Sequence, residues 1–411
     1  MHNTLGRAAM VNKDEPRIAK HFQLAVNCGG RVKQFENVIR YNREQLRLSL
    51  NNQENWQESA AIANGHDSMP TIRRVVVTGD FLRPSLEGYL SQENNIRWLF
   101  AILEPQLRAV IDPRSEDESA VRCFFGDLGL AHSVYTSLDM PFTESSWATV
   151  YNNALPLMAK EIIKNLIGED KATLIVGFEM PPSVLDYLTN TRIPYINTRI
   201  SPYRYLDDLL LGFSSNVPEI SRRLLDFDTP KPSLYLAASI EKQNRRSAVL
   251  SITQGALVFF GQTPRDTSLI QSNTFISFKD YKESIISAAN SVKARYYKPH
   301  PLLRDENAIS FFQDLGFELV DDNAYDLLSS NALDVVMGLN SSVLYEAVYF
   351  KKKVFRLHPP DPYANCVHVY DSFLNLAFWT KVLGKDVPAG NSRLTGRPNL
   401  MRESLGAWWA K

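Results

Sequence analysis

Short apolar runs that stop at glycine or at a polar residue recur along this 411-residue chain. They are rich in β-branched and aromatic residues, and segments with the apolar spacing of helices lie between them. Such runs are typical of strands buried on both faces of a parallel sheet. They occupy residues 73–78, 172–177, 193–197, 256–260, 294–297, 334–338 and 353–357. The alternation predicts an α/β protein with two doubly wound, Rossmann-like sheets that face each other across a cleft.

The length of the chain and one break in its pattern divide it into two domains. A chain of 411 residues exceeds what one hydrophobic core organises. Residues 226–233, Asp-Phe-Asp-Thr-Pro-Lys-Pro-Ser, break both the helical and the strand periodicity. We therefore predict one domain over residues 1–230 and another over residues 231–411, the second including a C-terminal tail. Residues 1–70 are polar, with one helical stretch, and the sequence assigns them no role.

Composition excludes several classes of protein. The 45 basic and 45 acidic residues balance, so a general positive field for nucleic acid is not expected. Three widely spaced cysteines support neither a disulfide framework nor a cysteine zinc site, which favours a reducing cytoplasm. No signal peptide or stretch of about 18 apolar residues is present. Trp408 and Trp409 fit either a docked tail helix or a peripheral contact with a membrane.

Two strand ends in the second half carry residues suited to phosphate. Lys298-Pro299-His300-Pro301 ends one predicted strand, and Ser341-Ser342 follows another and opens a helix. Prolines keep His300 extended at the strand end, and an imidazole can donate to a phosphate oxygen. Taken singly, these are a proline-rich turn and a favoured helix N-cap. Their occurrence at successive strand ends favours a nucleotide phosphate site, where Glu346 reaches a ribose hydroxyl or lies on an exposed helix face.

The motifs of other nucleotide and metal enzymes are absent. No GxGxxG follows the first strand, and neither GxxxxGK[ST] nor HExxH occurs. Asp226 and Asp228 have a D-x-D spacing that can hold a metal, but solvated linker carboxylates explain it better. We therefore expect no metal and no cofactor.

Carboxylates in the first half are candidates for the chemistry. Asp207 and Asp208 follow an aromatic loop that contains Arg204, and Glu179 ends a strand ahead of two prolines. Asp207 and Asp208 are either helix-cap charges or a nucleophile or general base, with Glu179 as the second carboxylate. Residues after the 256–260 strand are expected to line the same cleft, namely Gln262, Arg265 and Asp266.

The order of these motifs resembles a known group of enzymes. Lys-Pro-His-Pro at 298–301, with Ser341-Ser342 and Glu346, resembles the HP and SS motifs of bacterial transferases that use CMP-activated sugars. These include sialyltransferases and the Kdo (3-deoxy-D-manno-octulosonate) transferases of capsule and O-antigen assembly. The GQ…D.S pattern at 261–268 and the segment 201–209 are similar to segments of Kdo transferases, the latter to those of the retaining β-Kdo type.

The resemblance implies a GT-B fold, with an acceptor and catalytic domain at 1–230 and a CMP-binding domain at 231–411. It implies that His300 and Ser341-Ser342 bind the CMP phosphate, that Lys298 and Glu346 help hold the cytidine, and that Pro301 and Gln262 belong to the same CMP site. Asp207 or Asp208 would attack the anomeric carbon and form a covalent glycosyl-enzyme. An acidic EDGF-type motif of capsule Kdo transferases is missing, and Arg204–Asp208 stand in its neighbourhood.

The expected function is therefore transfer of Kdo from CMP-Kdo to a lipid-linked or oligosaccharide acceptor of an O-antigen or capsule glycan. The enzyme would act in the cytoplasm, at the inner face of the membrane or beside other glycan-assembly enzymes. Three alternatives remain open at this point. They are transfer of sialic acid or another nonulosonate from a CMP donor, epimerisation of a nucleotide sugar on the same fold, and a non-catalytic subunit that binds nucleotide or glycan.

Overall fold

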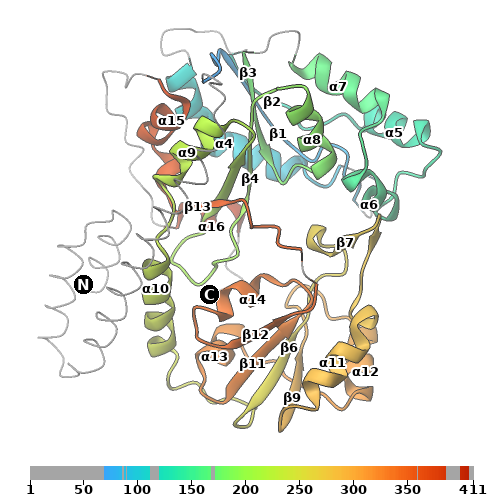
Figure 1. Ribbon diagram of the computed structural model, residues 1–411, viewed down its shortest axis with the longest axis vertical. Helices are drawn as coiled ribbons and strands as arrows, with labels where there is room; N and C mark the ends of the chain where they lie inside the picture. The colour runs from blue at the N-terminus through green and yellow to red at the C-terminus, as the bar shows by residue number, and fades with distance from the viewer. Residues whose placement is uncertain are drawn as a thin grey trace, which may run out of the picture.

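The computed structural model describes residues 69–385 and 399–406, apart from residues 86–87, 89, 112–119, 168–171 and 359. Residues 1–68 of the polar segment 1–70 lie outside this range, and so do Trp408 and Trp409. Figure 1 shows two α/β layers, one above the other, each built around a mostly parallel sheet. This arrangement confirms the prediction of two sheets with Rossmann-like alternation.

The first sheet has the strand order β13-β5-β4-β3-β1-β2. Strands β1 to β4 run parallel, whereas β5 is antiparallel to β4 and β13 is antiparallel to β5. Its strands are β1 (Arg74–Gly79), β2 (Val121–Cys123), β3 (Thr173–Phe178), β4 (Tyr195–Ile200), β5 (Leu211–Ser215) and β13 (Val367–Val369). Its helices are α4 (Glu93–Ile111), α5 (Leu128–Ser137), α6 (Glu144–Asn152), α7 (Leu157–Ile167), α8 (Pro182–Asn190), α9 (Pro218–Leu225), α15 (Leu376–Leu383) and α16 (Leu400–Leu405).

The second sheet has the order β10-β9-β6-β11-β12, and all its pairs are parallel. Its strands are β6 (Ala256–Phe260), β9 (Ala294–Lys298), β10 (Glu318–Leu319), β11 (Leu333–Gly338) and β12 (Lys353–Arg356). The hairpin β7 (Ile270–Gln271) and β8 (Thr274–Phe275) stands apart. The helices are α10 (Lys231–Asn244), α11 (Lys282–Ala289), α12 (Glu306–Asp314), α13 (Ala324–Ser329) and α14 (Ser342–Ala347), with 3-10 turns η2 (Thr267–Leu269), η3 (Phe278–Tyr281) and η4 (Ser372–Leu374).

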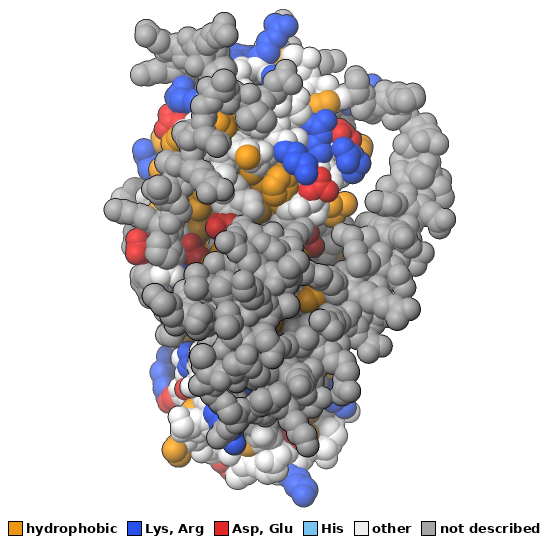
Figure 2. All heavy atoms as spheres, turned by 90° about the vertical axis from the view of Figure 1, so that its left-hand side faces the viewer, with side chains coloured by type: hydrophobic (Ala, Val, Ile, Leu, Met, Phe, Trp, Pro, Cys, Tyr) orange, Lys and Arg blue, Asp and Glu red, His pale blue; other side chains and the backbone are white. Residues whose placement is uncertain are grey.

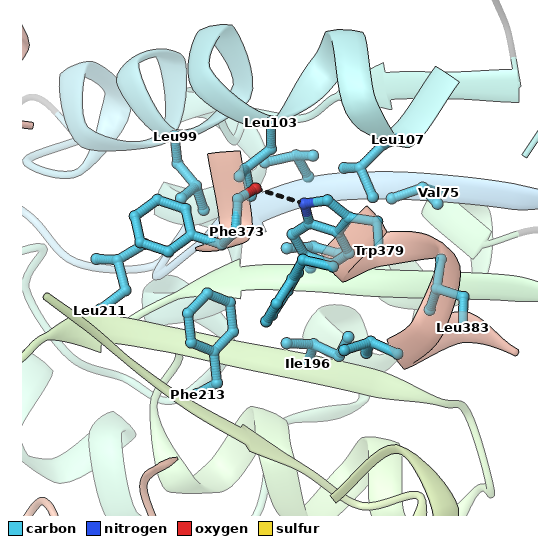
Figure 3. Packing of buried hydrophobic residues seen from close by; sticks show 14 of the residues in the cluster. Val75, Leu99, Leu103, Leu107, Ile196, Leu211, Phe213, Phe373, Trp379 and Leu383 are labelled. Atoms are coloured by element: carbon cyan, nitrogen blue, oxygen red, sulfur yellow. Dashed lines mark hydrogen bonds between the residues drawn. The ribbon is translucent and has the colours of Figure 1, made fainter. Parts of the chain in front are cut away.

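The largest core of the first half lies between its sheet and helices α4 and α15. Figure 3 shows Leu99, Leu103 and Leu107 of α4 above strand residues such as Val75 and Phe213. The leucines recur every four residues, so one face of α4 is apolar. Trp379 of α15 is fully buried, and its indole N–H donates to the Phe373 carbonyl over 2.8 Å. The burial of these side chains holds α4 and α15 against the first sheet.

The chain returns to the first sheet after β12. Strand β13 pairs with β5, and helix α15 packs against α4. The sequence assigned all of 231–411 to one C-terminal domain, whereas residues 367–369 extend the sheet of the first half and residues 376–383 pack against its helix α4. Strand β13 has three residues and pairs with a strand about 150 residues earlier, so local periodicity carries no sign of it.

Two segments bind the halves together. The segment 201–209, after β4, sends Tyr205 into the core of the second half, where its hydroxyl donates to the Leu234 carbonyl over 3.1 Å. In the opposite direction, Ile270 of β7 joins a core of the first half. The Arg265 side chain also forms an ion pair with Glu144 of α6. The segment 201–209 follows β4 and contains Arg204, Asp207 and Asp208. The segment 261–270 follows β6 and contains Gln262, Arg265 and Asp266.

Figure 2 shows the face on the left of Figure 1, where α9 and α15 lie. Basic, acidic and hydrophobic side chains alternate on its visible described part. Ion pairs join Arg222 to Glu219 over 2.7 Å and Lys381 to Asp226 over 2.8 Å. This part of the surface is thus of mixed charge. Among the described residues no helix has both the length and the apolar character needed to cross a membrane.

Candidate functional site

The carboxyl ends of β6 and β9 meet at Gly261 and His300. The Gly261 N–H donates to the Lys298 carbonyl over 2.8 Å. A Cβ at Gly261 would lie 2.9 Å from the Tyr297 hydroxyl and 3.1 Å from the His300 nitrogen, so the close approach requires glycine. Lys298 and His300 are half-buried and Pro301 is exposed. The sequence correctly brings these residues to one strand end.

His300 presents a fixed donor. Its Nδ1 accepts the Leu302 N–H over 3.2 Å, so the proton of the neutral ring resides on Nε2. Burial lowers the pKa of His300, the charges of Arg204 and Lys298 lower it further, and Asp266 opposes them. The ring is therefore neutral near pH 7 and offers Nε2–H to a ligand. Burial also lowers the pKa of Lys298, against the charges of Asp321 and Asp322.

Gln262 organises the end of β6. Its Nε2 donates to the Ser268 hydroxyl over 2.8 Å, and Ser268 donates to Asp266 Oδ1 over 2.7 Å. The Gln262 Oε1 accepts the Asn340 N–H over 3.1 Å. Gln262 thus links the predicted 261–268 motif to the residues that precede Ser341.

Ser341 and Ser342 lie at the start of α14, next to this hydrogen-bonded chain. Ser341 is the N-cap residue, yet its hydroxyl makes no capping hydrogen bond, and both serines are half-buried. Their hydroxyls therefore do not perform the capping role that is the usual reason for serine at such a position.

Glu346 is placed differently from the prediction. It is 3% exposed, and its Oε1 accepts the Tyr325 hydroxyl over 2.8 Å and the Arg204 backbone N–H over 2.6 Å. Burial raises its pKa to about 7. The side chain lies neither on an exposed helix face nor in an open position for a ribose. It fastens the 201–209 segment to α14.

Glu179 stands at the carboxyl end of β3 in an unusual state. Its backbone has φ +48, in the left-handed region that side chains other than glycine rarely adopt. Its carboxylate forms no hydrogen bond or ion pair with any residue that the structure describes. Burial raises its pKa, against the charges of Arg199, Arg83 and Arg204, and Asp266 raises it further. Backbone strain together with an unpartnered, half-buried carboxylate is typical of a functional position.

Sequence reasoning missed three residues around Glu179. Arg83 follows β1, Arg199 lies in β4, and Tyr363 belongs to the segment that returns to the first sheet. The Arg199 guanidinium carbon lies 5.8 Å from the centroid of the Tyr363 ring, and the charges of Arg204, Asp266, Arg199 and Glu179 all act on Tyr363. The sequence held one local sign of these three residues, because Arg83 lies just beyond the end of the first predicted strand.

Two charged residues connect the halves of the site. Arg204 and Asp266 act electrostatically on both Glu179, after β3 of the first sheet, and His300, after β9 of the second. The carboxyl ends of the two sheets therefore face a common group of charges. The charges of Arg204 and Asp266 thus act on both predicted strand ends, and Lys298 acts on His300 as well.

Asp207 and Asp208 belong to a different cluster. The Asp208 side chain is buried and accepts the N–H groups of Met401 and Arg402, each over 3.0 Å, at the start of α16. Asp207 is half-buried, and both aspartates act on Tyr370 rather than on the groups around Glu179. The sequence left two roles open for Asp207 and Asp208, a helix-cap charge or a catalytic group. The contacts of Asp208 are those of a helix-capping carboxylate.

The D-x-D carboxylates also have structural partners. Asp228 accepts the His368 N–H over 2.9 Å, and Asp226 pairs with Lys381. Within the described residues, no three His, Cys, Asp or Glu side chains come together as metal ligands. The residues at the ends of β9 and β11 include Lys, His and Ser side chains, whose N–H and O–H groups can donate to an anion.

Comparisons with known proteins found matches among solved structures alone. No protein-family model and no curated protein matches the sequence. Among the solved structures, Thermosulfurimonas dismutans KpsC, a beta Kdo 2,7 transferase, is matched with 18% identity and a TM-score of 0.31. The similarity covers 58% of this chain and 86% of that one.

Proposed function

We propose that this chain is a glycosyltransferase of the GT-B type that moves Kdo from CMP-Kdo to a growing O-antigen or capsule glycan. The observation that carries the proposal is the hydrogen bond from the Asn340 N–H to Gln262 Oε1, which holds the Ser341-Ser342 strand end beside the strand ends that carry Gly261 and His300. An anion-binding imidazole and an unpartnered carboxylate in one charge cluster are the parts that transfer from a nucleotide sugar requires. The HP and SS motifs of the sequence support the CMP donor.

The phosphate of the donor binds on the side of the second sheet. Nε2–H of His300, the Lys298 ammonium and the hydroxyls of Ser341 and Ser342 donate to its oxygens. Gln262 acts indirectly in this proposal. Its hydrogen bonds to Ser268 and to the Asn340 N–H hold the 261–268 segment beside Ser341 and Ser342. The negative charge that develops on the leaving phosphate is met by these donors.

Glu179 is the reacting carboxylate in this proposal. It attacks the anomeric carbon as the bond to the CMP oxygen breaks, and the bonding electrons leave with CMP. The acceptor hydroxyl then displaces Glu179, so the sugar retains its configuration. The resemblance described above implies Asp207 or Asp208 in this role. The hydrogen bonds that occupy both oxygens of Asp208 support Glu179 instead.

Intact-protein and peptide mass spectrometry after incubation with CMP-Kdo, without acceptor, tests the proposal. We expect a sugar-sized adduct on the peptide that contains Glu179, and none in Glu179→Gln. An adduct on the peptide that contains Asp207 would return the role to that residue. Calorimetry with CMP tests the donor side separately: His300→Ala should abolish binding, and an unchanged affinity would refute the phosphate assignment.

A further inference from the structure

We propose that the side-chain amide of Asn340 is the positioning group of the phosphate site. Asn340 directly precedes Ser341 and Ser342, and its amide ties the end of β11 to the segment 360–363, which follows β12. Asn340 would act through the two serines rather than by contact with the donor. This inference rests on the proposed function, because it concerns how the serines of the same donor site are held.

Asn340 is 3% exposed, and both of its backbone-facing donors are used inside the protein. Its Nδ2 donates to the Pro360 carbonyl over 2.7 Å, and its backbone N–H donates to Gln262 Oε1 over 3.1 Å. A carbonyl only accepts hydrogen bonds, so the contact with Pro360 fixes which side of the amide carries the nitrogen. The Oδ1 atom therefore faces Tyr345, whose hydroxyl lies 3.1 Å away.

The hydroxyl of Tyr345 has one proton and two acceptors. It lies 3.0 Å from Asp361 Oδ1 as well as 3.1 Å from Asn340 Oδ1. Asp361 has other partners, since its Oδ1 accepts the Tyr363 N–H over 2.9 Å and its Oδ2 lies 3.7 Å from Nη1 of Arg356. Asn340 Oδ1 has no other donor in the described part of the chain. The proton of Tyr345 therefore satisfies the buried amide oxygen.

These contacts bring three segments together around the end of β11. Gln262 follows β6, Tyr345 lies in α14 and Pro360 lies beyond the end of β12. The Leu357 N–H donates to the Gly338 carbonyl over 3.0 Å, so the chain after β12 still runs beside β11 just before the amide joins them. Because residue 340 is held from three directions, the backbone of the next two residues is held as well.

A short side chain with one donor and one acceptor is what this position requires. Aspartate has the same shape but no donor for the Pro360 carbonyl, and leucine offers neither group. Glutamine adds a methylene that a buried site would have to accommodate. The hydroxyl of Ser341, in contrast, makes no capping hydrogen bond. The amide is thus satisfied within the protein, whereas the neighbouring hydroxyl is left for a ligand.

A double-mutant cycle on CMP affinity, measured by calorimetry in the full chain, tests this role. Asn340→Ala should weaken CMP binding roughly tenfold in the otherwise unaltered chain. In a chain that already carries Ser341→Ala and Ser342→Ala, the same change should cost at most about a further twofold, because Asn340 acts through those hydroxyls. General damage to the fold would give equal losses in both backgrounds, and that result would overturn the proposal.

Asn216→Ala is the matched control. The half-buried Asn216 accepts the Tyr195 N–H over 2.9 Å and donates to the Ile193 carbonyl over 2.8 Å, beside the amino end of β4. Its replacement removes a comparable pair of amide hydrogen bonds away from the strand ends of the site, so CMP affinity should stay within about twofold. A tenfold loss in this control would attribute the effect of Asn340→Ala to stability and would overturn the proposal.

Tyr345→Phe keeps the proposal testable if Asn340→Ala does not fold. It removes only the hydroxyl that donates to Asn340 Oδ1. CMP binding should weaken roughly threefold in the unaltered chain and should not change when both serines are already alanine. Unchanged CMP affinity in the folded variants would overturn the positioning role while leaving the proposed function in place. Failure of the unaltered chain to bind CMP would instead refute the proposed function as well.

Discussion

The backbone N–H of Arg204 donates a 2.6 Å hydrogen bond to Oε1 of Glu346, which joins the segment after β4 to helix α14. The two residues are 142 positions apart in the sequence. Arg204 also influences His300 and Glu179 through its charge. Arg204 therefore joins the two halves through its backbone and acts on the candidate site through its side-chain charge.

Glu346→Gln should remove a pH dependence of stability. Burial raises the pKa of Glu346 from 4.5 to about 7. A raised pKa means that its contribution to folding is fully present below pH 4.5 and is lost as the pH rises through 7. The free energy of unfolding of the unaltered chain should therefore fall by up to roughly 3 kcal/mol, relative to the glutamine variant, between pH 4.5 and 8. Urea unfolding at both pH values measures this, and parallel curves would contradict it.

Asp208→Asn should destabilise the protein. The asparagine retains one acceptor but loses the charge that meets the N–H groups of Met401 and Arg402. We expect a decrease of about 1–2 kcal/mol in the free energy of unfolding for Asp208→Asn. Thermal unfolding gives the comparison. A stable Asp208→Asn variant without transfer activity would favour a catalytic role for this residue.

Glu179→Gly should make the protein more stable and inactive. Glycine adopts φ +48 without strain, so the free energy of unfolding should rise by about 1 kcal/mol. Glu179→Ala is the control, since it removes the carboxylate but keeps a Cβ in the strained conformation. Denaturant unfolding and transfer assays on both variants measure the two effects. Full turnover in either variant would exclude Glu179 from the reaction.

Arg199→Gln should shift the pH profile of transfer. The Arg199 charge lowers the pKa of Glu179 against the effect of burial, so its removal raises that pKa. An ionised nucleophile becomes inactive as the pH falls through its pKa. The acidic limb of kcat/KM should therefore move to higher pH in the variant. An unchanged limb would indicate that another group titrates.

Chelation should leave activity unchanged. The proposed phosphate donors are an imidazole, an ammonium and two hydroxyls, which can meet a phosphodiester charge directly. Transfer rates with and without EDTA, followed by addition of magnesium, measure this. A strict requirement for magnesium would contradict the assigned donor set.

The strand and helix pattern was readable from the sequence because burial imposes local periodicity. The apolar run at 73–78 corresponds to β1, Arg74–Gly79, and the run at 334–338 to β11, Leu333–Gly338. Strand β13 was missed because only its pairing with β5 makes it a strand. Short edge strands carry little sequence signal of their own.

Local sequence patterns alone were enough to predict two mostly parallel sheets and to put Lys298, His300, Ser341 and Gln262 at neighbouring strand ends. Parallel strands bring their carboxyl ends to one edge, so this much follows from local order alone. Only the tertiary structure decided which carboxylate remained available. Asp208 binds α16 and Glu346 binds Arg204, whereas the Glu179 carboxylate has no hydrogen-bond or ion-pair partner in the part of the chain that the structure describes. Those hydrogen bonds join residues 142 to 194 positions apart, and no local pattern encodes contacts at such separations.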